Sequence, residues 1–89
     1  MTIENVTIEQ IDLMKHAIRY ERNKIKKGKY TAWRNHFCTD RGDEDWEHLR
    51  KLKFATILDN SGGFVCYFVS REGMNLLENL LDIKIIEED

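Results

Sequence analysis

Basic side chains crowd the segment 19–34, where Glu21 is the sole acidic residue. Lysine and arginine at this density can hold phosphate groups, because each neutralised phosphate releases counterions and gives salt-dependent affinity. Gly28 interrupts any helix here, which predicts an exposed loop over residues 23–29. A charge run is also typical of a solvated surface without a ligand. The residues predicted to contact duplex DNA, if this segment binds it, are Arg22, Lys24, Lys26, Lys27, Lys29 and Arg34.

Acidic side chains dominate the segment 43–47. They complement the positive end of a helix dipole, and the basic residues within 50–53 complement its negative end. An acidic helix face repels phosphate and is therefore a poor reader of a DNA groove. Together with the aromatic segment before it, this face favours contact with an unidentified protein partner. The residues predicted to make that contact are Trp33, Glu44, Glu47 and His48.

Cysteine and histidine supply four nominal metal ligands, Cys38, Cys66, His36 and His48. Zinc sites normally carry paired ligands at C-x-x-C or H-x₃₋₅-H spacing, and the sequence has none, so we predict no metal. Cys66 is expected to be a small core hydrophobe, and Cys38 a half-buried thiol. The sequence also lacks a Gly-rich phosphate loop, a serine elbow and a dinucleotide fingerprint. We therefore expect no enzymatic activity and no cofactor.

The first element is a helix that begins at Thr7, because Thr7 and Gln10 have the spacing of a capping box. Apolar residues at three- and four-residue steps then predict a helix over about 8–22. Aromatic residues at helical spacing over 30–38 favour a short helix or an irregular anchored turn facing the core. The N-terminal half is thus expected to be helical, with the basic loop between its first two segments.

The third helix is expected to start from a cap at Asp43 or Gly42 and to end near Lys53. β-Branched and aromatic residues over 54–58 and 64–69 then flank an Asp-Asn-Ser-Gly-Gly segment. Such a segment supplies the positive-φ residues that a hairpin loop requires. The sequence therefore predicts a β-hairpin after the acidic helix.

Ser70 is expected to cap a final helix with a broad apolar stripe. The tail 83–86 fits a short strand or a frayed helix, and we predict fraying over 85–89. Because a small domain often completes its core by dimerising, the stripe predicts a symmetric homodimer. The predicted contacts of that dimer are Met74, Leu77, Leu80 and Leu81.

The order of these elements resembles a winged helix-turn-helix domain. The amino-acid pattern of residues 49–55 and 67–77 is similar to that of the C-terminal part of that fold. In that part of the fold, a helix leads directly into the wing. The last helix then opens with an aromatic residue, an aliphatic residue, a Ser or Thr, two variable residues and a Gly. Gly73 occupies that position and is expected to let the last helix pack closely on the wing. The resemblance implies an α+β winged-helix-like fold with three N-terminal helical segments, a hairpin wing and a C-terminal helix.

Most of the chain also resembles small bacteriophage and prophage proteins, in segments 13–17, 34–38, 43–52 and 68–73. That resemblance implies an origin and a fold but no activity. The first function that we expect is a non-enzymatic phage or prophage accessory protein that acts by protein–protein contact. The alternative is a winged-helix nucleic-acid-binding regulator that contacts phosphates through residues 22–34.

Eighty-nine residues are enough for one domain, so we expect 1–89 to form a single unit. No apolar run approaches the roughly 20 residues of a membrane span, and the N-terminus lacks the pattern of a secretory signal. The two cysteines show no disulfide framework. These features predict a protein without membrane contact in the cytoplasm of a bacterial host cell. A formal net charge of −2 excludes wholesale coating of nucleic acid but allows a local basic patch.

Overall fold

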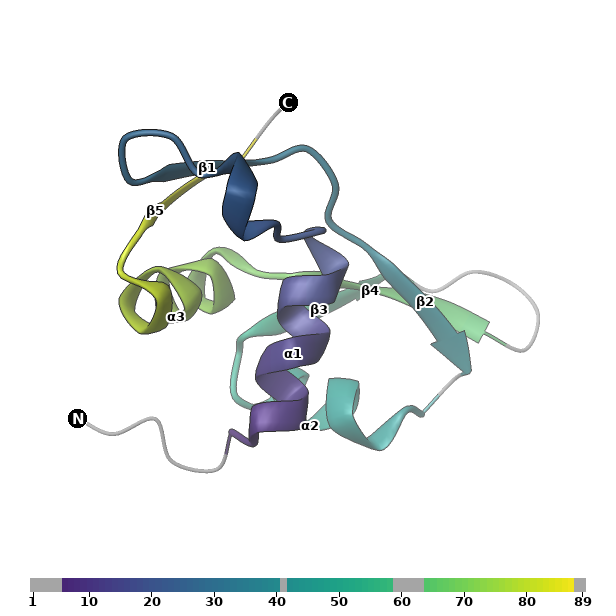
Figure 1. Ribbon diagram of the computed structural model, residues 1–89. Coiled ribbons are helices and arrows are strands. Elements are labelled where there is room, and N and C mark those ends of the chain that lie inside the picture. The colour runs from purple at the N-terminus through teal and green to yellow at the C-terminus, as the bar shows by residue number, and fades with distance from the viewer. Residues whose placement is uncertain (1–5, 41, 59–63, 88–89) are drawn as a thin grey trace.

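The computed structural model describes residues 6–40, 42–58 and 64–87. Helices and strands alternate along the chain, and the last strand returns to the first (Figure 1). In chain order, the elements are α1 (Ile8–Ala17), the 3-10 turn η1 (Arg22–Lys24), β1 (Lys29–Ala32), β2 (Phe37–Asp40), α2 (Glu44–Lys51), β3 (Ala55–Leu58), β4 (Phe64–Val69), α3 (Arg71–Leu81) and β5 (Lys84–Glu87).

The strands form two separate sheets. β4 lies at the centre of an antiparallel sheet in the order β2-β4-β3, in which Tyr67 is the register partner of both Phe37 and Ile57. β1 and β5 form a parallel pair in which Tyr30 lies opposite Ile85. The predicted hairpin is confirmed as β3 and β4, and its loop, 59–63, lies outside the described residues.

One apolar core lies between the sheets and the helices. The Trp46 and Tyr67 rings stack 5.4 Å apart, and neither residue has exposed surface. Met14 of α1 and Leu77 of α3 are equally buried. Tyr30 extends the core toward β1, and its hydroxyl donates hydrogen bonds to the carbonyl oxygens of two residues just past the end of α1.

Three predicted helix caps are confirmed. Thr7 and Gln10 form the capping box of α1, Asp43 Oδ1 accepts from the Trp46 N–H at the start of α2, and Ser70 Oγ accepts from the Gly73 N–H at the start of α3. These signals are local, because each needs a side chain within three residues of an unpaired backbone N–H.

Close packing of α3 on the hairpin depends on Gly73, as expected from the resemblance. A Cβ at this position would clash with the Phe54 carbonyl oxygen and lie 2.8 Å from Val69 Cγ1. The same Phe54 oxygen accepts a 3.0 Å hydrogen bond from the Ser70 N–H. Backbone groups at the two ends of the hairpin therefore meet the first turn of α3 without space for a side chain.

The prediction of a helical segment over 30–38 is wrong, because this region contributes β1 and part of β2. Along β1, buried Tyr30 and Ala32 alternate with exposed Lys29 and Thr31, which is the period of a strand. The first helix is also shorter than predicted and ends at Ala17.

Asn35 shows how the chain joins the two sheets. Its side-chain nitrogen donates to the Val69 carbonyl oxygen at 2.9 Å, and its side-chain oxygen accepts from the Val69 N–H at 2.8 Å. Phe37 is the register partner of Tyr67, so continuing the antiparallel β2–β4 register by two residues places Asn35 opposite Val69. The amide thus replaces two backbone hydrogen bonds where the chain turns away toward β1.

The prediction of fraying from residue 85 is wrong for 85–87, which lie in β5, whereas 88–89 lie outside the described residues. Glu78 of α3 accepts the Ile85 N–H at 2.7 Å. Arg71 forms ion pairs with Glu78 at 3.0 Å and Glu87 at 2.8 Å. The tail is therefore held by α3 as well as by β1.

The expected class, α+β, is confirmed, but the expected order of helices is not. Before the hairpin the sequence predicts three helical segments, whereas the structure has α1, the 3-10 turn η1 and α2, with β1 and β2 in place of the second segment. A helix-turn-helix needs two successive helices before the wing. The described chain has only α2 between β2 and β3, so the likeness to a winged helix is limited to α2, the β3–β4 hairpin and α3.

The prediction of two free thiols is wrong. Cys38 of β2 and Cys66 of β4 are direct register partners, and they form a disulfide. The sequence does not predict this disulfide, because a cross-strand disulfide needs two paired strands and the aromatic spacing over 30–38 favours a helix or a turn where β2 begins. Cytoplasmic location stays a prediction, but it loses the support of two unpaired cysteines, since disulfides are rare in that compartment. Within the described residues, no helix has the length and apolar character needed to cross a bilayer.

Candidate nucleic-acid interface

The outer face of the β1–β5 sheet carries positive charge. Tyr30 and Ile85 point into the core, so the residues before and after each of them are exposed. In the parallel register, Lys29 of β1 lies opposite Lys84 of β5, and Thr31 lies opposite Ile86. The sheet thus presents two lysines side by side at one end of its outer face.

A shallow groove of about 580 Å³ runs beside this sheet. It brings together side chains from η1, the turn before β1, and both strands. Its lining residues are Asn23, Lys24, Lys26, Lys29, Thr31 and Ile86. We call these residues and Lys84 the basic face.

A tight turn over residues 26–29 sets one edge of the groove. The Lys26 N–H and the Lys29 N–H each donate to the other residue's carbonyl oxygen at 2.9 Å. Lys27 and Gly28 between them have φ values of 54° and 74°, as two-residue turns of the primed type require. The Gly28 carbonyl oxygen accepts from the Lys84 N–H at 2.8 Å, which ties the turn to β5.

The charges of the basic face are mostly unneutralised. Lys24 forms an exposed ion pair with Glu21 at 3.3 Å. Within the described residues, no ion pair involves Lys26, Lys27, Lys29 or Lys84. Like charges directly opposite each other on a sheet are destabilising, so the register of Lys29 against Lys84 has a cost that a bound anion would remove.

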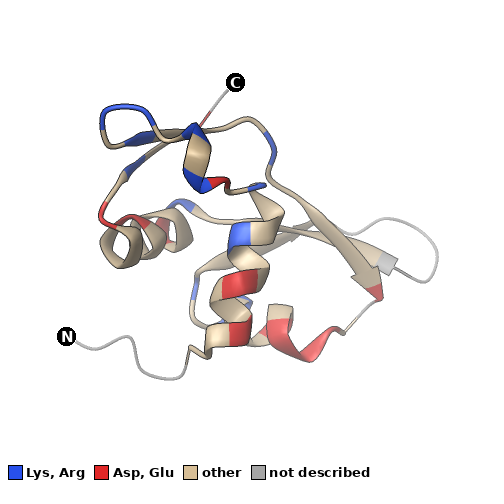
Figure 2. Ribbon diagram, viewed as in Figure 1, with Lys and Arg blue, Asp and Glu red and all other residues tan. Residues whose placement is uncertain are grey.

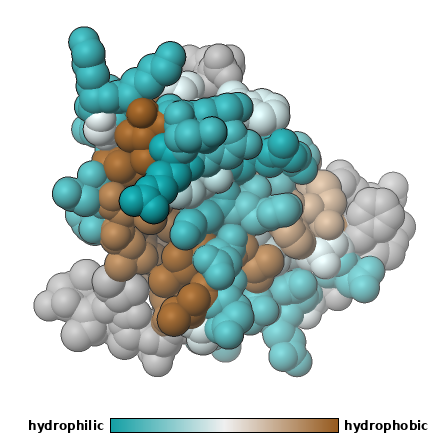
Figure 3. Space-filling model, viewed as in Figure 1, coloured by the Kyte–Doolittle hydropathy of each residue, from teal (hydrophilic) through white to brown (hydrophobic). Residues whose placement is uncertain are grey.

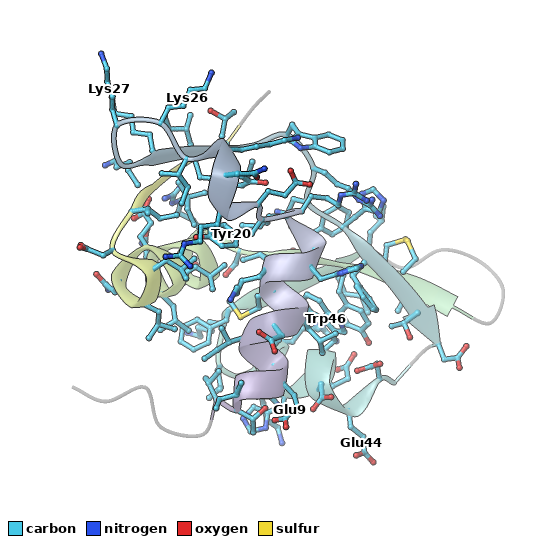
Figure 4. The ribbon with its side chains drawn as sticks, viewed as in Figure 1. Glu9, Tyr20, Lys26, Lys27, Glu44 and Trp46 are labelled. Atoms are coloured by element: carbon cyan, nitrogen blue, oxygen red, sulfur yellow. A yellow bond between two sulfur atoms is a disulfide. The ribbon has the colours of Figure 1, made fainter. Side chains whose placement is uncertain are left out.

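Acidic residues gather at the end of the molecule opposite the basic face, although Glu21, Asp82 and Glu87 lie close to that face. Figure 2 shows Lys and Arg around η1, β1 and the turn before it, and Asp and Glu around α2 and the start of α1. In Figure 4, Lys26 and Lys27 extend from one end, and Glu9 and Glu44 from the other. The net charge of −2 therefore conceals a strongly polar distribution.

Trp33 directly follows β1 and continues its outward row. It is 51% exposed, although a domain of this size has little apolar surface to spare. The guanidinium carbon of Arg19 lies 5.7 Å from the centre of the indole, within range of a cation–π interaction. In the view of Figure 3, the surface over η1 and β1 is largely hydrophilic, and hydrophobic residues gather along the side formed by β5 and α3.

Of the residues predicted to contact nucleic acid, Lys24, Lys26 and Lys29 meet at the groove, and Lys27 lies at the tip of its turn. Arg22 is exposed on η1, but neither it nor Arg34 lines the groove. The Arg34 Nε is buried and has no hydrogen-bond partner in the described structure.

Sequence reasoning missed Lys84 and Ile86, which enter the site from the other end of the chain. The strand-like tail was one of two alternatives, but its partner strand β1 was not recognised. Without that pairing, nothing placed residue 84 beside residue 29.

The residues predicted to bind a protein partner do not form one surface. Glu44, Glu47 and His48 line a pocket of about 660 Å³ on α2. Trp33 is absent from that pocket, and β1, which it follows, lies at the other end of the molecule from α2 (Figure 1).

Glu47 is already engaged within the chain. Its carboxylate accepts a 2.6 Å hydrogen bond from the Tyr67 hydroxyl and forms a 2.8 Å ion pair with Arg50. These hydrogen bonds, led by that from Tyr67, hold the pKa of Glu47 below its ordinary value. Burial, reinforced by the Glu47 carboxylate, raises the pKa of Tyr67 to about 12.

Two of the residues predicted to form a dimer interface are unavailable for one. Met74 and Leu77 are 1% and 0% exposed in the chain's own core, so their assignment as dimer contacts is wrong. Leu81 is partly buried against the core, and Leu80 is 40% exposed. A stripe along one helix does not reveal how much of it the domain itself covers.

Comparison of the chain with known protein families, with curated proteins and with solved structures finds no match. The resemblance to bacteriophage proteins stays a prediction, and the chemistry of the basic face has to be interpreted by itself.

Proposed function

We propose that this protein binds nucleic acid through the basic face. The observation that carries the proposal is the register of Lys29 against Lys84, two exposed like charges that the fold places side by side without a counter-ion among the described residues. Lys24 and Lys26 extend the positive charge along the groove. Phosphates are the polyanionic ligand that such a row suits, because each contact also releases bound counterions.

The separation of charge favours one orientation of the complex. A polyanion would be attracted to the basic face and repelled by the acidic end around α2. This binding mode does not use a recognition helix in a major groove, because α2 is acidic in its first turn and would repel phosphate. In the proposed complex, the nucleic acid instead lies in the groove beside β1 and β5.

Salt-dependent binding tests this function. We expect a labelled oligonucleotide to bind at about 50 mM salt, with a slope of about −3 to −4 in log affinity against log salt if four lysines contact phosphates. The double variant Lys29→Gln/Lys84→Gln removes two positive charges. It should weaken binding and reduce the size of that slope by about 1.5 to 2.

Lys51→Gln is the control, because Lys51 is an exposed lysine on α2 that lines the pocket there and lies away from the basic face. We expect it to leave the affinity and the slope unchanged. Absence of binding at low salt, or equal losses in the control and in the double variant, would contradict the proposal.

Contact with a protein is the second candidate, and the pocket on α2 favours it. Glu44 is exposed there, and the buried His48 Nε2 has no hydrogen-bond partner in the described structure. A partner with basic side chains would complement this face. Nuclease-treated host lysate should yield a protein that the wild type retains and that Glu44→Lys loses. The phage or prophage origin that the sequence resemblance implies is compatible with either candidate.

A further inference from the structure

We infer that the nucleic acid bound at the basic face is single-stranded and that one of its bases stacks on Trp33. This inference rests on the proposed function and adds the class of nucleic acid. Its starting observation is that the same outward row of β1 carries Lys29, Thr31 and then the half-exposed indole of Trp33. A sheet face that combines lysines with an exposed aromatic ring offers both a phosphate contact and a stacking surface.

The Trp33 indole contacts Arg19, whose backbone is itself held by Tyr30. The Tyr30 hydroxyl is hydrogen-bonded to the carbonyl oxygens of Ile18, at 3.1 Å, and Arg19. Arg19 has a positive φ of 55°, which is unusual for a residue with a side chain. This fixed backbone places the Arg19 guanidinium next to Trp33. The ring is thus held partly in place before a ligand arrives, which lowers the entropy cost of binding.

The dimensions suit a short strand. Lys29 and Trp33 are four residues apart along extended chain, a span of about 13 Å. Stacked nucleotides rise about 3.4 Å each, so the span covers about four of them. The groove of about 580 Å³ is on the scale of a short backbone segment rather than of a double helix.

Duplex DNA fits the same surface less well. Reading a major groove requires a helix or a two-stranded ribbon that enters it. The helical element at the basic face, η1, has three residues, and the two-stranded β1–β5 sheet has its inner face buried in the core, so neither is a free-standing element of that kind. The acidic α2 lies at the other end of the molecule. A duplex also keeps its bases stacked on one another, so Trp33 would gain no base to contact.

Tryptophan fluorescence gives a direct readout, because the two tryptophans differ in exposure. Trp33 is 51% exposed, whereas Trp46 is fully buried. We expect oligothymidylate of about 12 nucleotides to quench the emission of the wild-type chain and to leave that of Trp33→Phe unchanged. An equal-length duplex should bind more weakly and quench little.

Variants at Trp33 separate stacking from charge. Trp33→Ala should weaken binding of the single strand by about 5- to 100-fold, and Trp33→Phe should retain most of the affinity, because the energy lies in the ring. Leu58→Ala is the control for removal of an exposed apolar side chain, since Leu58 is 55% exposed on β3. Single-stranded DNA and RNA of the same length are compared to establish which sugar is preferred.

The outcomes distinguish the two proposals. If duplex and single strand bind equally and Trp33→Ala has no effect, the inference is overturned while binding at the basic face stands. If binding falls with Lys29→Gln/Lys84→Gln but no quenching occurs, the stacking of a base on Trp33 is overturned. If none of these nucleic acids binds at low salt, both proposals fail.

Discussion

Gly73 is a position where the addition of a single methyl group should lower stability. We expect Gly73→Ala to lower the free energy of unfolding by about 1–3 kcal/mol, because the new methyl group meets the Phe54 carbonyl oxygen and Val69 Cγ1. In an exposed helix the same substitution would be favourable. Urea denaturation measures the difference. Asn79→Ala, at an exposed position of the same helix, is the control and should be neutral or slightly stabilising.

Tyr67 should make stability depend on pH in the alkaline range. Because folding raises its pKa from about 10 to about 12, the neutral phenol stabilises the fold fully below pH 10. The free energy of unfolding should therefore fall as the pH rises from about 10 to about 12, by up to about 3 kcal/mol. Tyr67→Phe should be about 1 kcal/mol less stable at pH 7 but should show a flatter profile in this window.

Thermal unfolding across pH 8–12 measures that profile. Tyr20→Phe is the control, and it should keep the steep profile because Tyr67 remains intact. Burial also raises the pKa of Tyr30, so a shallower slope should remain in Tyr67→Phe, and a slope as steep as that of the wild type would contradict the assignment.

At the scale of elements, β5 is a structural strand rather than a tail. Ile85 is 1% exposed and its neighbour Ile86 is 41% exposed, although the two have the same side chain. Ile85→Ala should therefore cost about 2–5 kcal/mol, because it leaves a cavity between β1 and α3. Ile86→Ala should change stability by about 0.5 kcal/mol or less. Equal effects of the two substitutions on the urea midpoint would contradict the β1–β5 pairing.

The disulfide joins β2 to the centre of its sheet. Cys38 and Cys66 are 28 residues apart, so cross-linking them restricts the unfolded chain substantially. We expect reduction to lower the free energy of unfolding by about 3–4 kcal/mol. Melting curves with and without a thiol reductant test this value. The double variant Cys38→Ala/Cys66→Ala should melt near the reduced wild type and should not respond to reductant; a response would implicate another cause.

At the scale of the whole molecule, the burial of Met74 and Leu77 in the core reduces the apolar surface of α3 that is available for self-association. The homodimer stays a prediction, but its contact set is now Leu80 and the partly buried Leu81. If copies associate through α3 at high micromolar concentration, Leu80→Glu should convert a dimer mass into a monomer mass in light scattering. Its melting temperature should change little, because Leu80 lies outside the core. An unchanged dimer mass would move the interface elsewhere.

The sequence by itself determined the features that depend on near neighbours. The caps at Thr7, Asp43 and Ser70 and the β3–β4 hairpin follow from residues a few positions apart, where backbone preferences and short hydrogen bonds dominate. The requirement for glycine at position 73 was implied by the resemblance of residues 67–77 to the ending of a winged-helix domain, and its cause is contact with Phe54 and Val69 of the hairpin.

Tertiary structure alone decided the features that join distant segments. The parallel pairing of β1 with β5 forms because Tyr30 and Ile85 bury one face of each strand, whereas helical spacing of aromatic residues misled the local prediction. The basic face depends on that pairing, and the disulfide depends on a second long-range pairing, that of β2 with β4. Lys84 joins Lys29, and Trp33 separates from Glu44, because strand register rather than sequence proximity sets which side chains meet.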